Sequence, residues 1–293
     1  MRLVYTADLH GNLALYRALG EAALRWEADA AIIGGDLCPG TRPFESQPQA
    51  HAEFIRRDLA PLIAGWKRER TRLRVFAIPG NDDFQTVLPA LGELEQAGLL
   101  VSLHRRLLRL DSCSILGLAF VPPTPFSIKD FERRDIEGPV RQTMQSLRCV
   151  IGTESGTRLL ENFSAYLEAE PSIQEELTRL DRLLEPDPQP LIAVLHTPPA
   201  NTCCDRMLNH QHVGSQAVRQ WIEGRQPLLT LHGHIHESPR MSRSFADRIG
   251  STWVVNPGSD KQRPHLVFID TEDLGAMKHS LYGGVRLAGG GQP

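Results

Sequence analysis

Three histidines occupy alternate positions in the segment LLTLHGHIHES, residues 228–238: His232, His234 and His236. Alternate residues of an extended chain face the same side, so this spacing is compatible with metal binding by all three imidazoles. It is equally compatible with binding by two of them, or by none. The other residues that the fold brings to the same place must therefore decide between these interpretations.

Further polar side chains stand at the ends of short apolar runs elsewhere in the chain. Four such runs read as buried strands: LVYTAD (3–8), AAIIGGD (30–36), RVFAIPGN (74–81) and LIAVLH (191–196). The metal-capable residues at or just after their ends are Asp8, His10, Asp36, Asn81 and His196. The carboxyl ends of strands in an α/β sheet are where ligands bind, so we expect these side chains to meet His234 and His236 there.

Each of these residues also has an ordinary structural interpretation. Asp8 or Asn12 could cap the following helix, and Asp36 and Asn81 could form turns beside their preceding glycines. A single buried histidine is more often hydrogen-bonded than metal-bound. These roles do not explain why two aspartates, one asparagine and four histidines arrive at one sheet edge, so the pattern favours a metal site.

The mixed set of imidazole, carboxylate and amide donors indicates which metals to expect. Such donors suit borderline divalent ions, with Mn²⁺ favoured and Fe²⁺, Zn²⁺, Ni²⁺ or Co²⁺ as alternatives. Two ions about 3.5–4 Å apart can share a bridging carboxylate and a bridging hydroxide. This arrangement is suited to the hydrolysis of phosphate esters.

Strand-like and helix-like segments alternate along the chain, which predicts an α/β protein with helices on both sides of a sheet system. The expected helices are residues 12–26, 48–66, 83–97 and about 215–223. The remaining expected strands are about 100–110, 113–120, 228–234, 252–258 and 265–270. We expect one domain over residues 1–275, followed by a flexible glycine-rich tail over 276–293.

Residues 122–190 interrupt this alternation. The segment opens with PPTPF, closes with PDPQP and contains helix-like runs such as SIQEELTRLDRLLE. We expect a helical insertion folded over the main body. Because its amphipathic helices need an apolar surface to cover, we also expect it to pack near the metal site or to form a subunit contact.

The composition excludes several classes of protein. The 293 residues include 32 basic and 35 acidic side chains, a net charge of −3, which gives no general attraction to nucleic acid or an anionic membrane. No apolar run is long enough to span a bilayer, and no secretory signal is recognisable. Five cysteines without CxxC spacing favour a reduced, cytoplasmic protein. The sequence is also compatible with a homo-oligomer.

Five motifs together resemble those of the calcineurin-like metallophosphoesterase superfamily, and they occur in the family order. They are DLHGN (8–12), GD (35–36), GND (80–82), HTPP (196–199) and GHIH (233–236). The segments PTPF (123–126), HVGSQAV (212–218) and NPGS (256–259) further resemble a subgroup of small bacterial and archaeal phosphoesterases. The resemblance implies a four-layer α/β/β/α sandwich of the metallo-dependent phosphatase type, with a dinuclear metal site.

The resemblance also implies how the ligands are shared between two divalent metal ions. It assigns Asp8, His10 and His236 to one ion, and Asn81, His196 and His234 to the other, with Asp36 bridging them. Two of the three alternating histidines are then ligands. His232 stands where the family places no ligand, and we expect it to lie behind the ligands or in the core.

Two departures from the family pattern bear on catalysis. GDLCPG lacks the Asp-Arg-Gly of Ser/Thr protein phosphatases, which counts against a protein phosphatase. Asp82 stands where the family has its general-acid histidine, so the group that protonates the leaving oxygen is open between Asp82 and another residue such as His212. His212 lies just before Ser215, the expected N-cap of a helix whose terminus could face an anion.

The expected function is hydrolysis of a small phosphate ester by a hydroxide that bridges two metal ions, with Asp36, Asn81, His196, Asp82 and His212 as catalytic candidates. Phosphodiesters are favoured as substrates. A phosphomonoesterase, a nuclease and a non-catalytic protein-binding scaffold of the same fold are the alternatives. The complete set of seven ligands counts against the scaffold, and the near-neutral charge counts against the nuclease.

Overall fold

The computed structural model describes residues 1–138, 148–184 and 190–285. Its first sheet is built around parallel strands β1 (Arg2–Thr6), β2 (Ala30–Gly34), β3 (Arg74–Ile78) and β4 (Val101–Ser102). Antiparallel strands β13 (Val267–Asp270), β14 (Lys278–His279) and β15 (Gly283–Gly284) extend the sheet beyond β1. The strand order is β15-β14-β13-β1-β2-β3-β4, so the two strands that carry Asp8 and Asp36 at their ends are neighbours.

The second sheet has parallel strands at its centre and an antiparallel strand at each edge. The strands are β5 (Arg106–Arg109), β6 (Ser114–Leu118), β9 (Leu191–Leu195), β10 (Leu229–Leu231), β11 (Ala246–Ile249) and β12 (Thr252–Val255). Their order is β11-β12-β10-β9-β6-β5. Strands β9 and β10 lie side by side and in parallel, so His196 and the GHIH segment leave the sheet at the same end.

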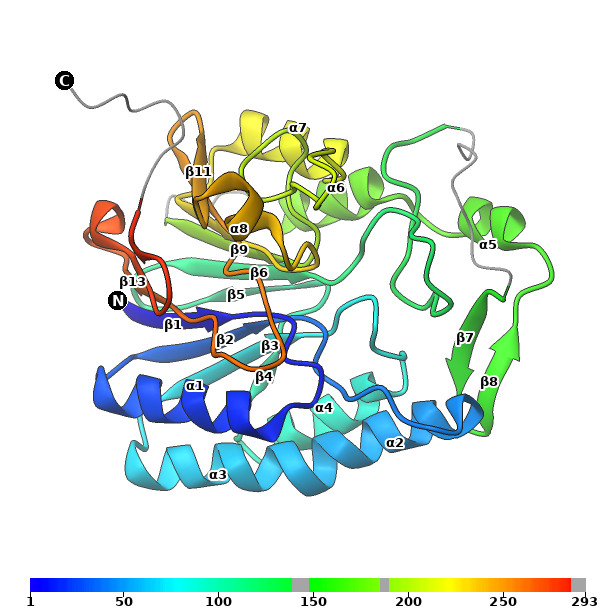
Figure 1. Ribbon diagram of the computed structural model, residues 1–293, viewed down its shortest axis with the longest axis horizontal. Helices are drawn as coiled ribbons and strands as arrows, with labels where there is room; N and C mark the ends of the chain where they lie inside the picture. The colour runs from blue at the N-terminus through cyan, green and yellow to red at the C-terminus, as the bar shows by residue number, and fades with distance from the viewer. Residues whose placement is uncertain (139–147, 185–189, 286–293) are drawn as a thin grey trace.

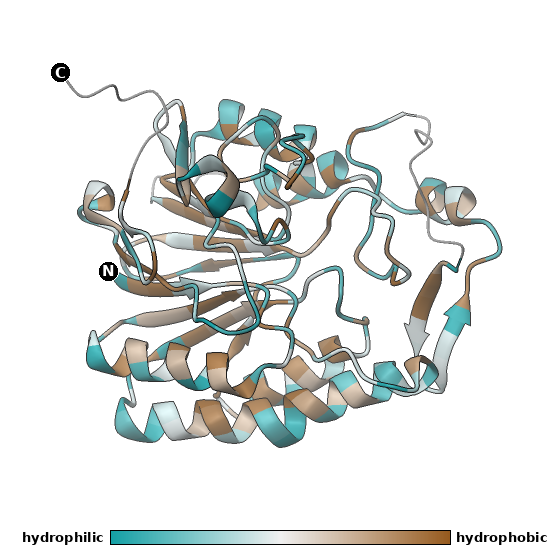
Figure 2. Cartoon of the chain, viewed as in Figure 1, coloured by the Kyte–Doolittle hydropathy of each residue, from teal (hydrophilic) through white to brown (hydrophobic). Residues whose placement is uncertain are grey.

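The two sheets pack face to face between two layers of helices, which gives the four layers visible in Figure 1. Helices α1 (Leu13–Arg25), α2 (Gln47–Phe54), α3 (Ala60–Glu69) and α4 (Val87–Gln96) cover the first sheet. Helices α6 (Ile173–Leu184) and α7 (Gln216–Arg225) cover the second. Apolar residues gather in the strands between these layers, as the colouring in Figure 2 shows.

Local sequence explains how the helical layers form. Asn12 caps α1, because its side chain accepts hydrogen bonds from the backbone N–H groups of Ala14 and Leu15. Leu15, Leu19 and Ala23 then recur every four residues and face the sheet. A π-helical segment, Ile55–Leu59, joins α2 and α3 into one longer helix, which agrees with the helix expected over 48–66.

The strand expected over residues 100–110 is two strands in the structure, and they belong to different sheets. β4 pairs with β3 in the first sheet, whereas β5 pairs with β6 in the second. Arg105, with φ of 57°, lies at the turn where the chain passes from one sheet to the other. The apolar residues on both sides of the crossing contribute to the same core between the sheets, so their pattern does not reveal that the chain changes sheet.

The insertion is only partly helical. It contains α5 (Phe163–Ala169) and α6, but also a hairpin of β7 (Val150–Thr153) and β8 (Gly156–Leu159) that the sequence did not predict. Helix α6 packs against α7, and β8 packs against α2 (Figure 1). The insertion therefore folds onto the main body, while residues 139–147 and 185–189 of it lie outside the described part.

The C-terminal segment differs from the flexible tail expected over 276–293. Strands β14 and β15 continue the first sheet, so the described chain stays ordered up to residue 285. The rest of the expected tail, 286–293, lies outside the described residues. Among the helices that the structure describes, none combines the length and apolar character needed to cross a membrane.

A short helix, α8 (Ser238–Ser242), follows the GHIH segment, and a 3₁₀ turn, η3 (Leu274–Ala276), precedes β14. A further 3₁₀ turn, η1 (Phe44–Ser46), leads into α2. Each of these short elements lies in a connection within one sheet: η1 between β2 and α2, α8 between β10 and β11, and η3 between β13 and β14.

Candidate metal centre

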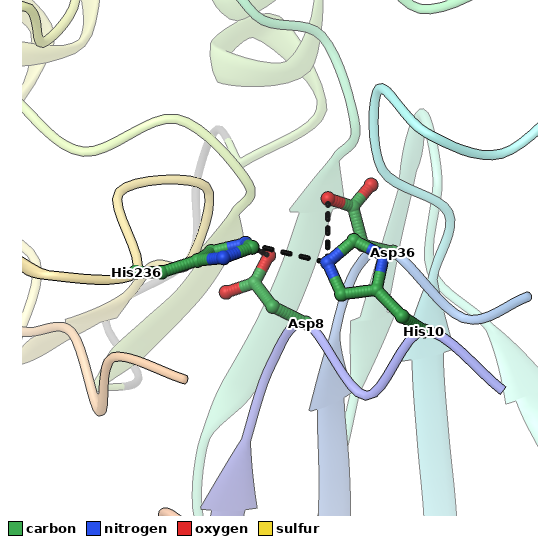
Figure 3. A group of neighbouring side chains, drawn as sticks. All are labelled: Asp8, His10, Asp36 and His236. Atoms are coloured by element: carbon green, nitrogen blue, oxygen red, sulfur yellow. Dashed lines mark hydrogen bonds and ion pairs between the residues drawn. The ribbon is translucent and has the colours of Figure 1, made fainter. Parts of the chain in front are cut away.

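Four of the predicted ligands form one compact group at the carboxyl end of the first sheet. Asp8 and His10 follow β1, Asp36 follows β2, and His236 approaches from the loop after β10 (Figure 3). Each offers one ligand atom, and these atoms all lie within 4.8 Å of one another. A carboxylate and imidazole group of this kind can hold a divalent cation.

Distances within this group show that Asp36 lies between two sets of donors. His10 Nε2 is 3.8 Å from Asp36 Oδ2 and 3.3 Å from His236 Nε2. His236 Nε2 is in turn 3.6 Å from Asp8 Oδ1. The other oxygen of Asp36, Oδ1, is the one that lies nearest to His196, which follows β9 of the second sheet.

The other predicted ligands come together on that second side of Asp36. His196 Nε2 lies 3.5 Å from Asp36 Oδ1 and 3.1 Å from Asn81 Oδ1. The ring centroids of His196 and His234 are 5.4 Å apart. The structure therefore brings all seven predicted residues to one place, with Asp36 between the two groups.

Backbone contacts fix which nitrogen of His196 faces the carboxylates. Its Nδ1 lies 2.8 Å from the carbonyl oxygen of Gly34, which makes Nδ1 the protonated donor and leaves Nε2 free to bind. The Asp8 carboxylate accepts hydrogen bonds of 3.1 Å from the backbone N–H of His234. Partners of this kind hold a ligand in position and are typical of metal sites.

Glycines of the motifs leave the space that the donor atoms need. A Cβ on Gly80 would lie 2.2 Å from Asp36 Oδ1 and 2.7 Å from His196 Nε2. A Cβ on Gly35 would lie 2.2 Å from His196 Nδ1. Any side chain at either position would therefore displace a donor, which explains the glycine in the GD and GND motifs.

Four of the predicted ligands have a left-handed backbone conformation, which non-glycine residues adopt at a cost of about 1–3 kcal/mol. They are Asp8 (φ 57°), His10 (φ 43°), Asp36 (φ 50°) and His234 (φ 66°). Strain of this kind persists where the surrounding structure enforces it, and it clusters at functional sites. Here it turns each side chain from the end of its strand toward the common centre.

The charges of the site favour a bound cation. Burial opposes ionisation of Asp36, but His196 and His10 hold the pKa of this carboxyl well below its ordinary value. Burial likewise opposes protonation of His196, but Asp36 and Asp8 raise its pKa to about 9. In the metal-free chain the His196 imidazole thus supplies positive charge that the buried carboxylates require, and a metal ion would replace that charge.

His232 does not join this group, as the sequence predicted. Its ring is fully buried, with Nδ1 at 2.9 Å from the carbonyl oxygens of both Leu195 and Thr197. Its Nε2 lies 2.8 Å from the hydroxyl of Thr230. Burial lowers the pKa of His232 to about 4, so it is a neutral residue that ties β9 to β10.

Residues of the NPGS segment hold the ligand loops from behind. Asn256 donates from its side-chain amide to the carbonyl oxygens of Cys204, Gly233 and Ile235. Ser259 donates its hydroxyl to the carbonyl oxygen of Asp8, at 2.7 Å. In the sequence, the NPGS segment was notable only because it resembles a segment of a phosphoesterase subgroup. Its hydrogen bonds show that it supports the loops that carry the predicted ligands.

Asp83 has a supporting role that the sequence reasoning missed. This buried carboxylate accepts hydrogen bonds from the backbone N–H groups of Leu37, Cys38 and Gly80, so it joins the loops that carry Asp36 and Asn81. With Cys38 and His51 it forms a second group of metal-capable side chains. The three backbone hydrogen bonds give Asp83 a structural role, because they hold the two loops together.

Asp82 lies at the mouth of the site. Its Oδ2 is 3.8 Å from His10 Nδ1, and its Oδ1 accepts a hydrogen bond from the Asn81 amide. Burial, together with the Asp36 carboxylate, raises the pKa of Asp82 to about 7. Two cavities, of about 300 and 260 Å³, share Asp82 and Phe126 as lining residues.

His212 pairs with a buried carboxylate, and its catalytic role remains a prediction. Its Nδ1 contacts the buried carboxylate of Asp205 at 2.7 Å, and its side chain is one-third exposed. The neighbouring Val213 lines the larger cavity. Among the described residues that line the two cavities, His212 does not occur. Ser215 caps α7, as predicted, by accepting a hydrogen bond from the N–H of Val218.

The fold and the donor set define the class of protein: an α/β/β/α sandwich of the metallo-dependent phosphatase type with a metal-binding group at the strand ends. The sequence matches the calcineurin-like phosphoesterase family over residues 1–238. The chain therefore belongs to the calcineurin-like phosphoesterase family. No curated protein sequence matches it.

Solved structures with low sequence identity share this fold. The protein TT1561 of Thermus thermophilus is 18% identical, with a TM-score of 0.58 over 97% of this chain and 99% of that chain. A dimetal phosphatase from Danio rerio is 13% identical, with a TM-score of 0.53 over 92% of this chain and 91% of that chain. At these identities the likeness is to the fold alone.

Proposed function

We propose that this protein is a dinuclear metal-dependent phosphodiesterase. The observation that carries the proposal is the convergence of seven donor residues on the two sides of the Asp36 carboxylate. We assign Asp8, His10 and His236 to one ion, Asn81, His196 and His234 to the other, and Asp36 to both. Mn²⁺ is the favoured metal, since mixed nitrogen and oxygen donors suit it.

The donor chemistry fits two divalent ions. Asp36 Oδ2 faces His10 and its Oδ1 faces His196, at 3.8 and 3.5 Å. The space around these atoms is kept open by Gly80, where a Cβ would lie 2.2 Å from Asp36 Oδ1. When bound, two such ions supply an activated water for attack on phosphorus and charge stabilisation for the phosphoryl oxygens.

The chain's own residues have distinct tasks in this reaction. The fully buried imidazole of His196 excludes bulk water from the inner side of the site, and the half-buried ring of His234 lies beside it, with the ring centroids 5.4 Å apart. Asp82 lies at the mouth and contributes the one carboxyl group that the described linings of both cavities share. We propose it as the residue closest to the leaving oxygen. Bound divalent ions nearby would favour its ionised form, which cannot donate a proton, so the reaction would depend on the leaving group itself.

Two cavities on either side of Asp82 support a diester over a monoester. A phosphodiester carries two ester arms, whereas a monoester carries one arm and an additional negative charge. The cavity of about 300 Å³ contains Asp36 and Asn81, and the cavity of about 260 Å³ contains His10. Each arm of a diester bound at the metal centre can thus enter its own cavity.

The remaining properties follow from composition and burial. All five cysteines are buried and none of them stands in a CxxC spacing, which supports our proposal of a reduced, cytoplasmic enzyme. The net charge of −3 supports a small phosphate ester over nucleic acid as the substrate.

A substrate screen of the metal-loaded protein tests the proposal. The Mn²⁺-loaded protein should hydrolyse an aryl phosphodiester faster than the matching monoester, and removal of the metal should abolish both activities. The panel should also include cyclic nucleotides, nucleotides and phospholipid head groups. A protein that binds two ions but hydrolyses no ester in this panel would favour the scaffold interpretation instead.

A further inference from the structure

We propose that the larger cavity is a subsite for an uncharged aromatic arm of the phosphodiester. This inference rests on the proposed function, because it concerns the substrate of the same metal centre. The cavity has a volume of about 300 Å³ and contains the ligands Asp36, Asn81, His234 and His236 at its inner end. A phosphate at the metal centre would therefore place one of its arms directly in this space.

The outer walls of this cavity are apolar and come from two loops. One is the segment PPTPF, which contributes Pro122, Pro123, Pro125 and Phe126. The other is the loop between β9 and α7, which contributes Met207 and Val213. Of the five large apolar side chains that the described surface exposes, three lie on these loops: Phe126 (54% exposed), Leu208 (57%) and Val213 (36%).

Exposed apolar residues concentrated beside a catalytic centre indicate a ligand that covers them. Phe126 is the central one, because it lines both cavities and lies between them with Asp82. A ring bound in the larger cavity would cover part of Phe126 and the flat faces of the neighbouring prolines. Pairing with another ring also strengthens the binding of an aromatic group by roughly two- to tenfold, beyond the effect of the area that it buries.

The charge of the lining excludes an anionic arm. The described residues around this cavity include no lysine or arginine, whereas two acidic residues, Asp82 and Glu237, lie at its edge. A second phosphate or a carboxylate on the arm would meet these groups without any positive partner. The metal centre can neutralise the phosphodiester itself, so the arm that enters the cavity should be uncharged.

A buried ion pair fixes the PPTPF wall. Lys129 Nζ lies 2.9 Å from both oxygens of Glu132 and donates at 2.8 Å to the carbonyl oxygen of Thr124. Glu132 also accepts hydrogen bonds from the backbone N–H and the hydroxyl of Thr124. Both charged side chains are fully buried, so the loop that carries Phe126 is held by a network without solvent access.

A second buried carboxylate fixes the opposite wall. Asp205 accepts hydrogen bonds from the backbone N–H groups of Asn201, Thr202 and Gly214 and from His212. The loop is also tied to the metal side, since the Leu208 N–H donates to the Glu237 carboxylate at 3.1 Å. The cavity is therefore preformed, which favours a rigid, flat arm over a flexible chain.

Binding of matched diesters that are not activated for hydrolysis tests this proposal. The probes are dimethyl, benzyl methyl, cyclohexylmethyl methyl and 4-carboxybenzyl methyl phosphate, titrated calorimetrically into the Mn²⁺-loaded full-length protein. The benzyl ester should bind about tenfold more tightly than dimethyl phosphate and several-fold more tightly than the cyclohexylmethyl ester. The carboxylate of 4-carboxybenzyl methyl phosphate should remove most of this gain in affinity.

Variants at the wall complete the experiment. Phe126→Ala should abolish the preference for the benzyl ester while the affinity for dimethyl phosphate stays the same, and Phe126→Leu should reduce the preference only in part. Leu183→Ala, which removes an equally exposed apolar side chain on α6, is the matched control and should change neither affinity. Equal binding of the benzyl and cyclohexylmethyl esters would overturn the proposal, as would equal weakening of all probes by Phe126→Ala.

Failure of the proposed function would be distinguishable from failure of this inference. If the metal-loaded protein hydrolyses phosphodiesters but the benzyl ester has no advantage, the catalytic proposal stands and the aromatic subsite is refuted. If the benzyl ester is preferred but no ester is hydrolysed, the subsite stands and the catalytic proposal fails. A nucleoside diester and a phenyl diester of equal charge then show which source of aromatic ring the cavity prefers.

Discussion

The buried pair of Lys129 and Glu132 leads to a prediction that combines stability with the geometry of the site. We expect Lys129→Met to destabilise the protein strongly, because methionine preserves the apolar stem but removes the ammonium group. Three hydrogen bonds are lost, one to Thr124 and two to Glu132. The Glu132 carboxylate then remains fully buried without its counter-ion.

The size of the expected stability loss follows from the difference between breaking a buried ion pair and replacing both of its members. Removal of one partner costs about 3–5 kcal/mol, whereas replacement of both partners by neutral groups of similar shape is often close to neutral. The double variant Lys129→Met, Glu132→Gln should therefore recover more than half of the loss. Glutamine keeps a carbonyl oxygen for the N–H of Thr124, which is why it is preferred over an apolar residue here.

The loss of stability caused by Lys129→Met should also depend on pH, and it should become larger as the pH rises. Burial raises the pKa of Glu132 from 4.5 to about 7, although Lys129 opposes the shift. Without Lys129 the pKa rises further, so above pH 7 the folded variant retains a proton that the natural protein has released. The unfolded chains of both proteins have lost this proton, and the variant therefore loses up to about 1.4 kcal/mol of additional stability per pH unit.

Urea unfolding of the natural protein and the variants at pH 6.5 and 8.5 measures these effects. Lys278→Met, at an exposed position in β14, is the control for loss of one positive charge. The penalty of Lys129→Met should be larger at pH 8.5. Two results would show that the side chains do not act as a buried ion pair. One is that the stability losses of Lys129→Met and Glu132→Gln, measured singly, add up in the double variant; the other is that the loss for Lys129→Met is equal at both pH values.

Three further predictions concern the metal centre and its chemistry. Asp36→Asn should lower the content of both metal ions and abolish hydrolysis, because both ions share this carboxylate; elemental analysis that finds two ions bound would contradict the assignment. His234→Gln should deplete one metal site whereas His232→Gln should leave the metal content nearly unchanged, so equal losses would refute the separation of these histidines. Asp82→His should raise the rate for alkyl esters more than for aryl esters, within the roughly 10²–10⁴-fold range of a general acid. A rate independent of leaving-group pKa in the natural protein, with chemistry rate-limiting, would instead show that an acid is already present.

The fold class and the meeting of the predicted ligands could be recognised from the sequence because both depend on local patterns. Each parallel strand is a short apolar run, and the ligand follows its end by a few residues, as Asp8 follows β1 and Asp36 follows β2. Once the strands are parallel, their ends coincide and the donors must meet. The alternation of His232, His234 and His236 could not be resolved by spacing, because a turn at His234 (φ 66°) interrupts the extended chain.

The walls of the cavities could not be predicted, because they depend on pairings between distant segments. The carboxylate of Asp130 accepts hydrogen bonds from the backbone of Gln85 and Gly152, which joins the insertion to the loop after Asn81. No periodic pattern in the sequence predicts such contacts. For the same reason the hairpin β7–β8 was missed, and the boundary of the domain at residue 275 with an insertion over 122–190 remains a prediction.

Binding of the metals and recognition of the ester arm depend on different buried polar side chains. The ligand loops are held by Asp83 and Asn256, whereas the cavity walls are held by Glu132 and Asp205. In the described structure no hydrogen bond of Glu132 or Asp205 reaches a predicted metal ligand. Substitutions in the PPTPF segment can therefore alter which ester is bound while the metal content stays the same, so specificity and catalysis in this chain should respond separately to mutation.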